Sequence, residues 1–239
     1  MVNIIQDFIP AGRKNRPGRA NPDIYITIHN TANTSKGAGA KSHAAYLKSD
    51  AAASIPASYH YTVDDKEIYQ HLPDTEDAYH AGDGSGDGNR KSIGIEICEN
   101  SDGDILKATD NAAQLTAMLC KKYNIPITNV IQHNNWSGKD CPSQIRAGKP
   151  YNWNMFLNNV RGYLKEGDMT EAEIRKIVQD EIKAALKGEG TGLSVWAKDD
   201  AANMIRLGIT DGTRPAGAVT REEAWVMLGR LLKYINGGH

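Results

Sequence analysis

Two segments, Ile24-Tyr25-Ile26-Thr27-Ile28-His29 and Ile93-Gly94-Ile95-Glu96-Ile97-Cys98, alternate isoleucine with other residues. Successive side chains of a strand point to opposite faces, so the isoleucines of each segment share one face. His29 and Glu96 then fall on the other face. Each segment predicts a strand with one packed face and an ionisable group at or near the strand end.

Further periodic segments surround these two strands. Strand patterns lie at Ser58–Val63, Glu67–His71 and Ile127–Gln132, and helical patterns lie at Ala38–Lys48, Asp110–Tyr123 and Trp153–Leu164. Strands and helices mixed in this order favour an α/β fold, in which a mixed central β-sheet is flanked by helices. A small all-α region is expected to follow at the C-terminal end.

We expect three parts along the chain: residues 1–165, a helix and linker at 166–192, and a small helical unit at 193–239. Thr170 and Glu173 form a capping box that opens a helix at 170–187 with one apolar stripe. We expect the apolar stripe of this helix to pack on a neighbouring domain or to join two copies of the chain as a homo-oligomer. The unit at 193–239 is too short to bury a large core by itself.

The composition excludes some classes of protein. The chain has 239 residues and a formal net charge of −1, which argues against binding to nucleic acid. Its apolar runs are too short for membrane insertion. Residues 1–17 lack a continuous apolar stretch, so we expect no Sec-type signal peptide. The three cysteines form no CxxC pair, which disfavours a disulfide framework.

His29, His133 and Cys141 suggest a metal site. His133 follows a strand pattern, and Cys141 lies in a polar loop eight residues later. Two histidines and a cysteine suit zinc, and three protein ligands leave a fourth position for water. Glu96 could act as the base for that water. Taken singly, each signal is weak, because a lone strand histidine or glutamate is more often structural or solvated.

Five motifs in order connect these residues to a known family. They are Ile28-His29-Asn30-Thr31, Tyr59-His60-Tyr61, His80-Ala81-Gly82-Asp83-Gly84, Asn89-Arg90-Lys91-Ser92-Ile93-Gly94-Ile95-Glu96-Ile97-Cys98 and His133-Asn134-Asn135-Trp136-Ser137-Gly138-Lys139-Asp140-Cys141-Pro142. Over residues 4–164 the chain resembles the type 2 N-acetylmuramoyl-L-alanine amidases, relatives of the peptidoglycan recognition proteins. It is most similar to endolysin catalytic domains from phages and prophages of Bacillus-like hosts.

The resemblance implies a zinc enzyme that cuts the amide bond between N-acetylmuramic acid and L-alanine of bacterial peptidoglycan. It implies that His29, His133 and Cys141 bind Zn²⁺ and that Glu96 handles the proton of the attacking water. An endolysin of this kind waits in the host cytoplasm until it is released to the cell wall.

The resemblance also implies roles for five further residues. Lys139 matches a lysine that steadies the developing oxyanion, and Tyr59 matches a tyrosine that orients water or substrate. Residues expected to bind substrate are His80, Asn30 and Trp136.

The C-terminal unit resembles an S-layer homology repeat. The matching segments are Trp196-Ala197, Leu207-Gly208-Ile209-Thr210-Asp211-Gly212, Pro215 and Thr220-Arg221-Glu222-Glu223-Ala224. The family role of such repeats is noncovalent attachment to secondary cell-wall polymers. They normally occur in threes, whereas this chain has a single copy.

Three alternatives remain at this point. A non-catalytic peptidoglycan-binding protein is disfavoured by Cys141, because recognition members of the related fold usually lack the cysteine ligand. A zinc peptidase that cuts within the peptide stem has the same site chemistry. The segment from Asp83 to Gly88 resembles the start of a calcium loop, but its twelfth position is Gly94 instead of glutamate. We therefore expect this segment to form a flexible loop at the rim of the groove that binds the glycan-peptide substrate.

Overall fold

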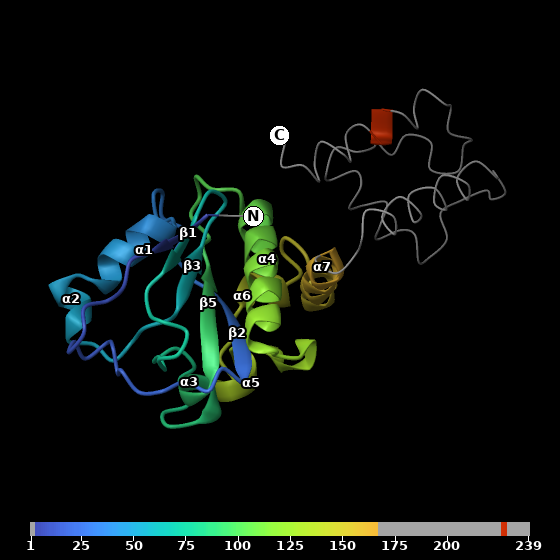
Figure 1. Ribbon diagram of the computed structural model, residues 1–239. Coiled ribbons are helices and arrows are strands. Elements are labelled where there is room, and N and C mark those ends of the chain that lie inside the picture. The colour runs from blue at the N-terminus through green and yellow to red at the C-terminus, as the bar shows by residue number, and fades with distance from the viewer. Residues whose placement is uncertain (1–2, 167–225, 229–239) are drawn as a thin grey trace. The chain divides into compact units, whose positions relative to one another are not determined.

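The computed structural model describes residues 3–166 and 226–228, and its first part is built on a mixed six-stranded sheet (Figure 1). The strands are β1 (Ile4–Gln6), β2 (Tyr25–Asn30), β3 (Tyr61–Val63), β4 (Ile68–Gln70), β5 (Ser92–Ile97) and β6 (Val130–Gln132). Their order across the sheet is β1-β4-β3-β5-β2-β6. β3 and β4 are antiparallel, and the other neighbours are parallel.

Helices cover both faces of the sheet. They are α1 (Ala40–Leu47), α2 (Asp50–Ala53), α3 (Asp87–Arg90), α4 (Ile105–Tyr123), α5 (Asn134–Ser137), α6 (Ser143–Arg146) and α7 (Trp153–Glu166). In Figure 1, α4 and α7 lie on one side of the sheet, and α1 and α2 lie on the other. This arrangement confirms the predicted α/β fold with a mixed central sheet flanked by helices.

The alternating isoleucines form the centre of the main core. Ile26 and Ile28 of β2 lie opposite Ile93 and Ile95 of β5, and all four are fully buried. They pack in one cluster with apolar side chains of α4 and α7, among them the fully buried Phe156. Burial of each such side chain stabilises the fold by roughly 1.5–3 kcal/mol. The other face of β2 and β5 is thereby left to polar side chains.

Helix α4 begins five residues before the predicted start at Asp110. The side chain of Asp104 accepts hydrogen bonds from the main-chain N–H groups of Leu106 and Lys107, which caps the helix. The cap, and not the apolar periodicity, determines where this helix starts. The predicted end at Tyr123 is confirmed, and Asn124 adopts a left-handed conformation there.

Two further features, both at strands of the sheet, differ from the sequence predictions. The predicted strand Ile127–Gln132 is a 3₁₀ turn over Ile127–Asn129 followed by β6. Pro126 stands at the N-cap of this turn and cannot donate to a strand ladder. β1, which pairs with β4 at the sheet edge, was not predicted, because three residues are too few for a periodic pattern.

The chain divides into two units, Met1–Asp168 and Met169–His239. The predicted helix at 170–187, the linker up to residue 192 and the S-layer homology-like unit at 193–239 lie outside the described residues, except for 226–228, which are helical. Within the part of the chain that is described, no helix has the length and apolar character needed to cross a membrane.

Candidate metal centre

The three predicted metal ligands come together at one edge of the sheet. His29 lies near the end of β2, His133 directly follows β6, and Cys141 lies in the loop before α6. All three side chains are buried, and one ligand atom from each lies within 4.8 Å of the others. They converge because β2 and β6 are parallel neighbours, so both strands end at the same edge.

The interatomic distances suit a small cation. The Cys141 Sγ atom lies 3.7 Å from His29 Nδ1, and Glu96 Oε1 lies 3.7 Å from the same nitrogen. Sulfur and nitrogen ligands of a tetrahedral zinc ion are about 3.6 Å apart, given ordinary zinc–ligand bond lengths. His133 Nδ1 is buried and has no hydrogen-bond partner within residues 3–166. The donor set therefore fits Zn²⁺.

His133 is oriented by a main-chain group. Its Nε2 donates to the carbonyl oxygen of Ala81 at 2.8 Å, which leaves Nδ1 as the atom with a free lone pair. Histidine ligands of metals commonly have their second nitrogen fixed in this way. The contact also ties His133 to the segment that follows His80.

Asn134 fixes the loop that carries Cys141. Its side-chain amide donates to the carbonyl oxygens of Gly138 and Lys139, and its main-chain N–H donates to the carbonyl of Cys141. Gly138 adopts a positive φ of 74°, which turns the chain between α5 and the cysteine. The loop is therefore tied through Asn134 to the residue that follows His133.

Burial sets the protonation states of the ligands. It is the main cause of the lowered pKa values of His29 and His133, and Lys139 contributes to both. The imidazoles are therefore neutral, as metal binding requires. Burial also raises the pKa of the Cys141 thiol to about 11, with Glu96 adding to the shift. A bound cation would be needed to hold the sulfur as a thiolate at neutral pH.

Glu96 faces the same centre from β5. It lies opposite His29 in the sheet register, and its side chain is 14% exposed. Burial raises the pKa of Glu96 to about 8, while Lys139 opposes the shift and Glu99 adds to it. A carboxyl group that titrates near neutral pH and lies next to a metal site is suited to accept and return a proton.

The sequence matches one protein family over more than half of its length. Residues 19–144 match the family described as N-acetylmuramoyl-L-alanine amidase. The chain is also 48% identical over 214 residues to N-acetylmuramoyl-L-alanine amidase XlyA of Bacillus subtilis (strain 168), in a match that covers 87% of this chain and 67% of XlyA.

This chain belongs to the N-acetylmuramoyl-L-alanine amidase family.

Solved structures of this family share the fold. The catalytic domain of XlyA superposes with a TM-score of 0.63 at 55% identity, covering 66% of this chain and 99% of that domain. A mutant endolysin from Bacillus subtilis gives the same TM-score and identity, covering 67% and 99%. The chain spans 67% of the length of XlyA and 62% of the length of a second relative, N-acetylmuramoyl-L-alanine amidase CwlH of Bacillus subtilis (strain 168).

The other two predicted catalytic residues, Lys139 and Tyr59, interact electrostatically with Glu96. Lys139 is exposed, and its charge acts on Glu96, His29 and Cys141. Burial raises the pKa of Tyr59 well above its ordinary value, and the charge of Glu96 adds to the shift. The catalytic roles of these residues stay predictions.

The three residues predicted to bind substrate have partners inside the protein. The Asn30 Oδ1 atom accepts from the main-chain N–H of Gln144 at 3.3 Å. The indole N–H of Trp136 donates to Thr27 Oγ1 at 2.9 Å. His80 is buried behind His29, with its Nδ1 3.0 Å from His29 Nε2. These contacts support positioning roles, and contact with substrate stays a prediction.

His43 is a residue of the site that sequence reasoning missed. Its Nδ1 lies 3.2 Å from the hydroxyl of Tyr59. His43 lies three residues after Ala40 and four before Leu47, which are both buried. That spacing places it on the inner side of α1 and could have indicated its position.

The glycine-rich loop is held more firmly than expected. The carboxylate of Asp83 accepts from the main-chain N–H groups of Gly88 and Asn89, at the start of α3. The side chain of Asn89 in turn accepts from the N–H groups of His80 and Ala81. The loop therefore supports the segment that orients His133, which the expectation of a flexible rim did not include.

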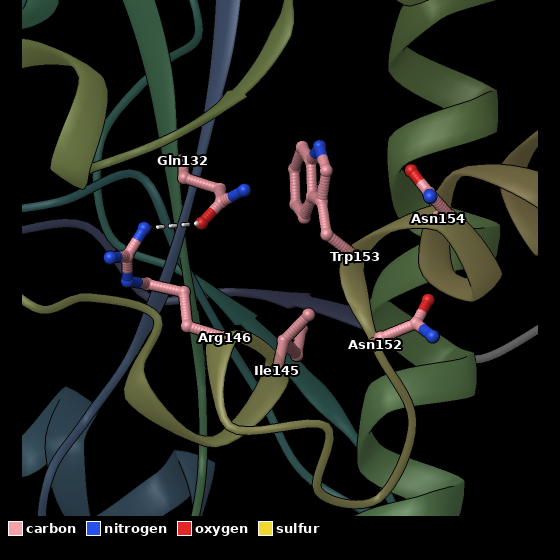
Figure 2. Close-up of a pocket in the computed structure, with 6 residues that line it drawn as sticks. All are labelled: Gln132, Ile145, Arg146, Asn152, Trp153 and Asn154. Carbon is pink, nitrogen blue, oxygen red and sulfur yellow. Dashed lines mark hydrogen bonds between the residues drawn. The ribbon is translucent and has the colours of Figure 1, made fainter.

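A separate cavity lies beside α7 (Figure 2). It has a volume of about 440 Å³ and is lined by Gln132, Ile145, Arg146, Asn152, Trp153 and Asn154. The guanidinium of Arg146 donates to Gln132 Oε1 at 3.2 Å across it. None of the three candidate ligands lines this cavity, so it is distinct from the metal centre.

Proposed function

We propose that this chain is a zinc-dependent N-acetylmuramoyl-L-alanine amidase that hydrolyses the amide bond between N-acetylmuramic acid and L-alanine in peptidoglycan. The observation that carries the proposal is the convergence of His29, His133 and Cys141, with Glu96 3.7 Å from the His29 nitrogen that faces them. Membership of the amidase family supplies the substrate class.

The residues of this chain suit each proton transfer of an amide hydrolysis. Zinc held by the three ligands would supply a water of lowered pKa and polarise the scissile carbonyl. Glu96 accepts the proton of the attacking water as the new C–O bond forms. It then donates that proton to the nitrogen of L-alanine as the C–N bond breaks. The same carboxyl group thus serves as base and as acid.

Lys139 and Tyr59 complete the proposed mechanism. Lys139 donates to the carbonyl oxygen as negative charge develops on it, which is an interaction that strengthens in the transition state. Tyr59 orients water or substrate through its hydroxyl, which His43 holds from α1. Its raised pKa keeps Tyr59 protonated, so that it can act as a hydrogen-bond donor.

The decisive experiment is digestion of purified Gram-positive peptidoglycan, with and without a chelator, followed by mass spectrometry. Free stem peptides beginning with L-alanine, lost on chelation and restored by zinc, are the expected result. Fragments cut within the stem would instead indicate the zinc peptidase. Intact glycan-peptide with retained binding would indicate the non-catalytic peptidoglycan-binding protein.

We also propose an endolysin role in which residues 193–239 attach the enzyme to secondary cell-wall polymers. The S-layer homology-like motifs and the likeness to a Bacillus subtilis endolysin support this role. Such an enzyme would be held in the host cytoplasm until release, and residues 170–187 could join two copies. Deletion of residues 168–239 should weaken sedimentation with cell walls more than it slows cleavage of small muropeptides. Unchanged wall retention would exclude the attachment role.

A further inference from the structure

A chain of polar side chains, which begins at the partly buried Trp136, runs along the polar face of β2 and β5 toward His29. The indole N–H of Trp136 lies 2.9 Å from Thr27 Oγ1, which lies 2.8 Å from Ser92 Oγ. Ser92 Oγ lies 2.6 Å from the carbonyl oxygen of Gly88. Thr27 and Ser92 are both fully buried.

His80 connects this chain to the metal ligand. Its Nε2 lies 3.4 Å from Ser92 Oγ, and its Nδ1 lies 3.0 Å from His29 Nε2. The ring lies flat against β5 because residue 94 is glycine. A Cβ atom on Gly94 would meet the His80 ring at 2.8 Å. This contact explains a residue with poor strand propensity in the middle of a buried strand.

The carbonyl at one end of the chain fixes the direction of its hydrogen bonds. A carbonyl can only accept, so Ser92 gives its hydrogen to Gly88. The hydrogen between Thr27 and Ser92 therefore comes from Thr27, which in turn accepts from the indole N–H of Trp136. Ser92 therefore has no hydrogen left for His80 and must accept one from His80 Nε2.

This direction continues through His80 to His29. A buried neutral imidazole carries one hydrogen, and in His80 it is on Nε2. Nδ1 of His80 is then an acceptor, and the only hydrogen that can fill the 3.0 Å contact comes from His29 Nε2. The lone pair of His29 is thus on Nδ1, which faces Cys141 Sγ and Glu96 Oε1 at 3.7 Å each.

We propose that Trp136, Thr27, Ser92 and His80 form a positioning relay that holds His29 in its Nε2–H tautomer and presents Nδ1 to the metal. The inference rests on the proposed zinc site but not on the reaction it performs. The second ligand is fixed differently, because one carbonyl, that of Ala81, orients His133. For His29, the relay takes the part that the Ala81 carbonyl plays for His133. Main-chain carbonyls of β2 and β5 are already used in strand pairing.

The test compares two substitutions of His80 that differ in where they place an acceptor. In His80→Asn, Oδ1 stands at the position of the ring Nδ1 and can still accept from His29. In His80→Gln, the amide nitrogen reaches the position of Nε2, and no acceptor remains at the δ position. The tautomer of His29 is read from its ¹⁵N chemical shifts in the metal-free full-length chain, and zinc affinity is measured by competition with a chelator.

We expect the Nε2–H tautomer of His29 in the wild type and in His80→Asn, with zinc affinity within a few-fold of the wild type. In His80→Gln we expect mixed tautomers and zinc binding about 10–100-fold weaker. An Nδ1–H tautomer in the wild-type protein overturns the proposal. So does an unchanged His29 tautomer with unchanged zinc affinity in His80→Gln.

A second pair of variants keeps the proposal testable if His80→Gln does not fold. Ser92→Ala removes the acceptor for His80 Nε2 and should shift the His80 tautomer toward Nδ1–H. Ser58→Ala is the matched control, because Ser58 is also a fully buried serine but accepts from Tyr79 outside the relay. Equal His29 spectra in the two variants overturn the relay. Since both readouts use the protein without substrate, failure of the amidase assay would not be mistaken for failure of the relay.

Discussion

Replacement of Glu96 by glutamine tests the assigned proton transfer directly. The change preserves the shape of a side chain that is 14% exposed and removes its ability to carry a proton. Because Glu96 Oε1 lies 3.7 Å from His29 Nδ1, a water at the metal would be within its reach. General acid–base catalysis typically contributes ~10²–10⁴-fold. We therefore expect kcat for muropeptide cleavage to fall by that factor, equivalent to ~3–5 kcal/mol of activation free energy.

The assay measures L-alanine-terminated peptides by mass spectrometry and zinc content by elemental analysis of the same sample. The three ligands are unchanged in Glu96→Gln, so about one zinc per chain should remain. Glu67→Gln is the control, because it makes the same chemical change at the turn between β3 and β4. Full activity of zinc-loaded Glu96→Gln would remove Glu96 from the mechanism. Loss of zinc together with activity would make Glu96 part of the metal centre instead.

Three further results are expected. Lys139→Ala should reduce kcat by about 100-fold or more at unchanged zinc content, as loss of an oxyanion donor does; an unchanged kcat would exclude that role. Gly94→Ala should lower the free energy of unfolding by ~1–3 kcal/mol, since its Cβ would meet the His80 ring at 2.8 Å, and urea titration measures this. Burial lowers the pKa of His71 to about 3, so the unfolded chain binds a proton below pH 6.5 that the folded chain does not. Stability should therefore fall on acidification from pH 6.5 toward 3, by ~1.4 kcal/mol per pH unit for this residue. In His71→Gln that slope should be smaller by the same amount, and equal slopes in metal-free protein would contradict the assignment.

The parts of the fold that could be predicted are those set by local periodicity. The alternation in Ile24–His29 and Ile93–Cys98 identified two central strands and the face on which His29 and Glu96 lie. A segment of three residues such as β1 carries no such period, and its pairing with β4 depends on residues more than sixty positions away. The start of α4 was missed because a single capping side chain, that of Asp104, decides it.

The metal ligands could be predicted because their chemistry is visible in residue type. Two histidines and a cysteine at strand ends suggest zinc wherever parallel strands bring them to one edge. The roles of His80, Asn30 and Trp136 could not be read this way. Each was expected to face substrate, yet each has a partner within the protein that is at least 50 positions away in the sequence. A sequence motif shows that certain residues occur together. It does not show which of them contact substrate and which of them hold another side chain in position.

The two faces of β2 and β5 explain why such support is needed. One face is closed by isoleucines that pack against α4 and α7. On the other face His29 is buried, and a buried histidine that rotates or changes tautomer would lose its lone pair for the metal. A single hydroxyl could not prevent this, because a hydroxyl can either donate or accept. In the chain behind His29, the Gly88 carbonyl can only accept, so it fixes the hydrogen of Ser92 and, through Ser92, those of Thr27 and His80. The isoleucine alternation that builds the core therefore also creates the need for the polar side chains behind His29.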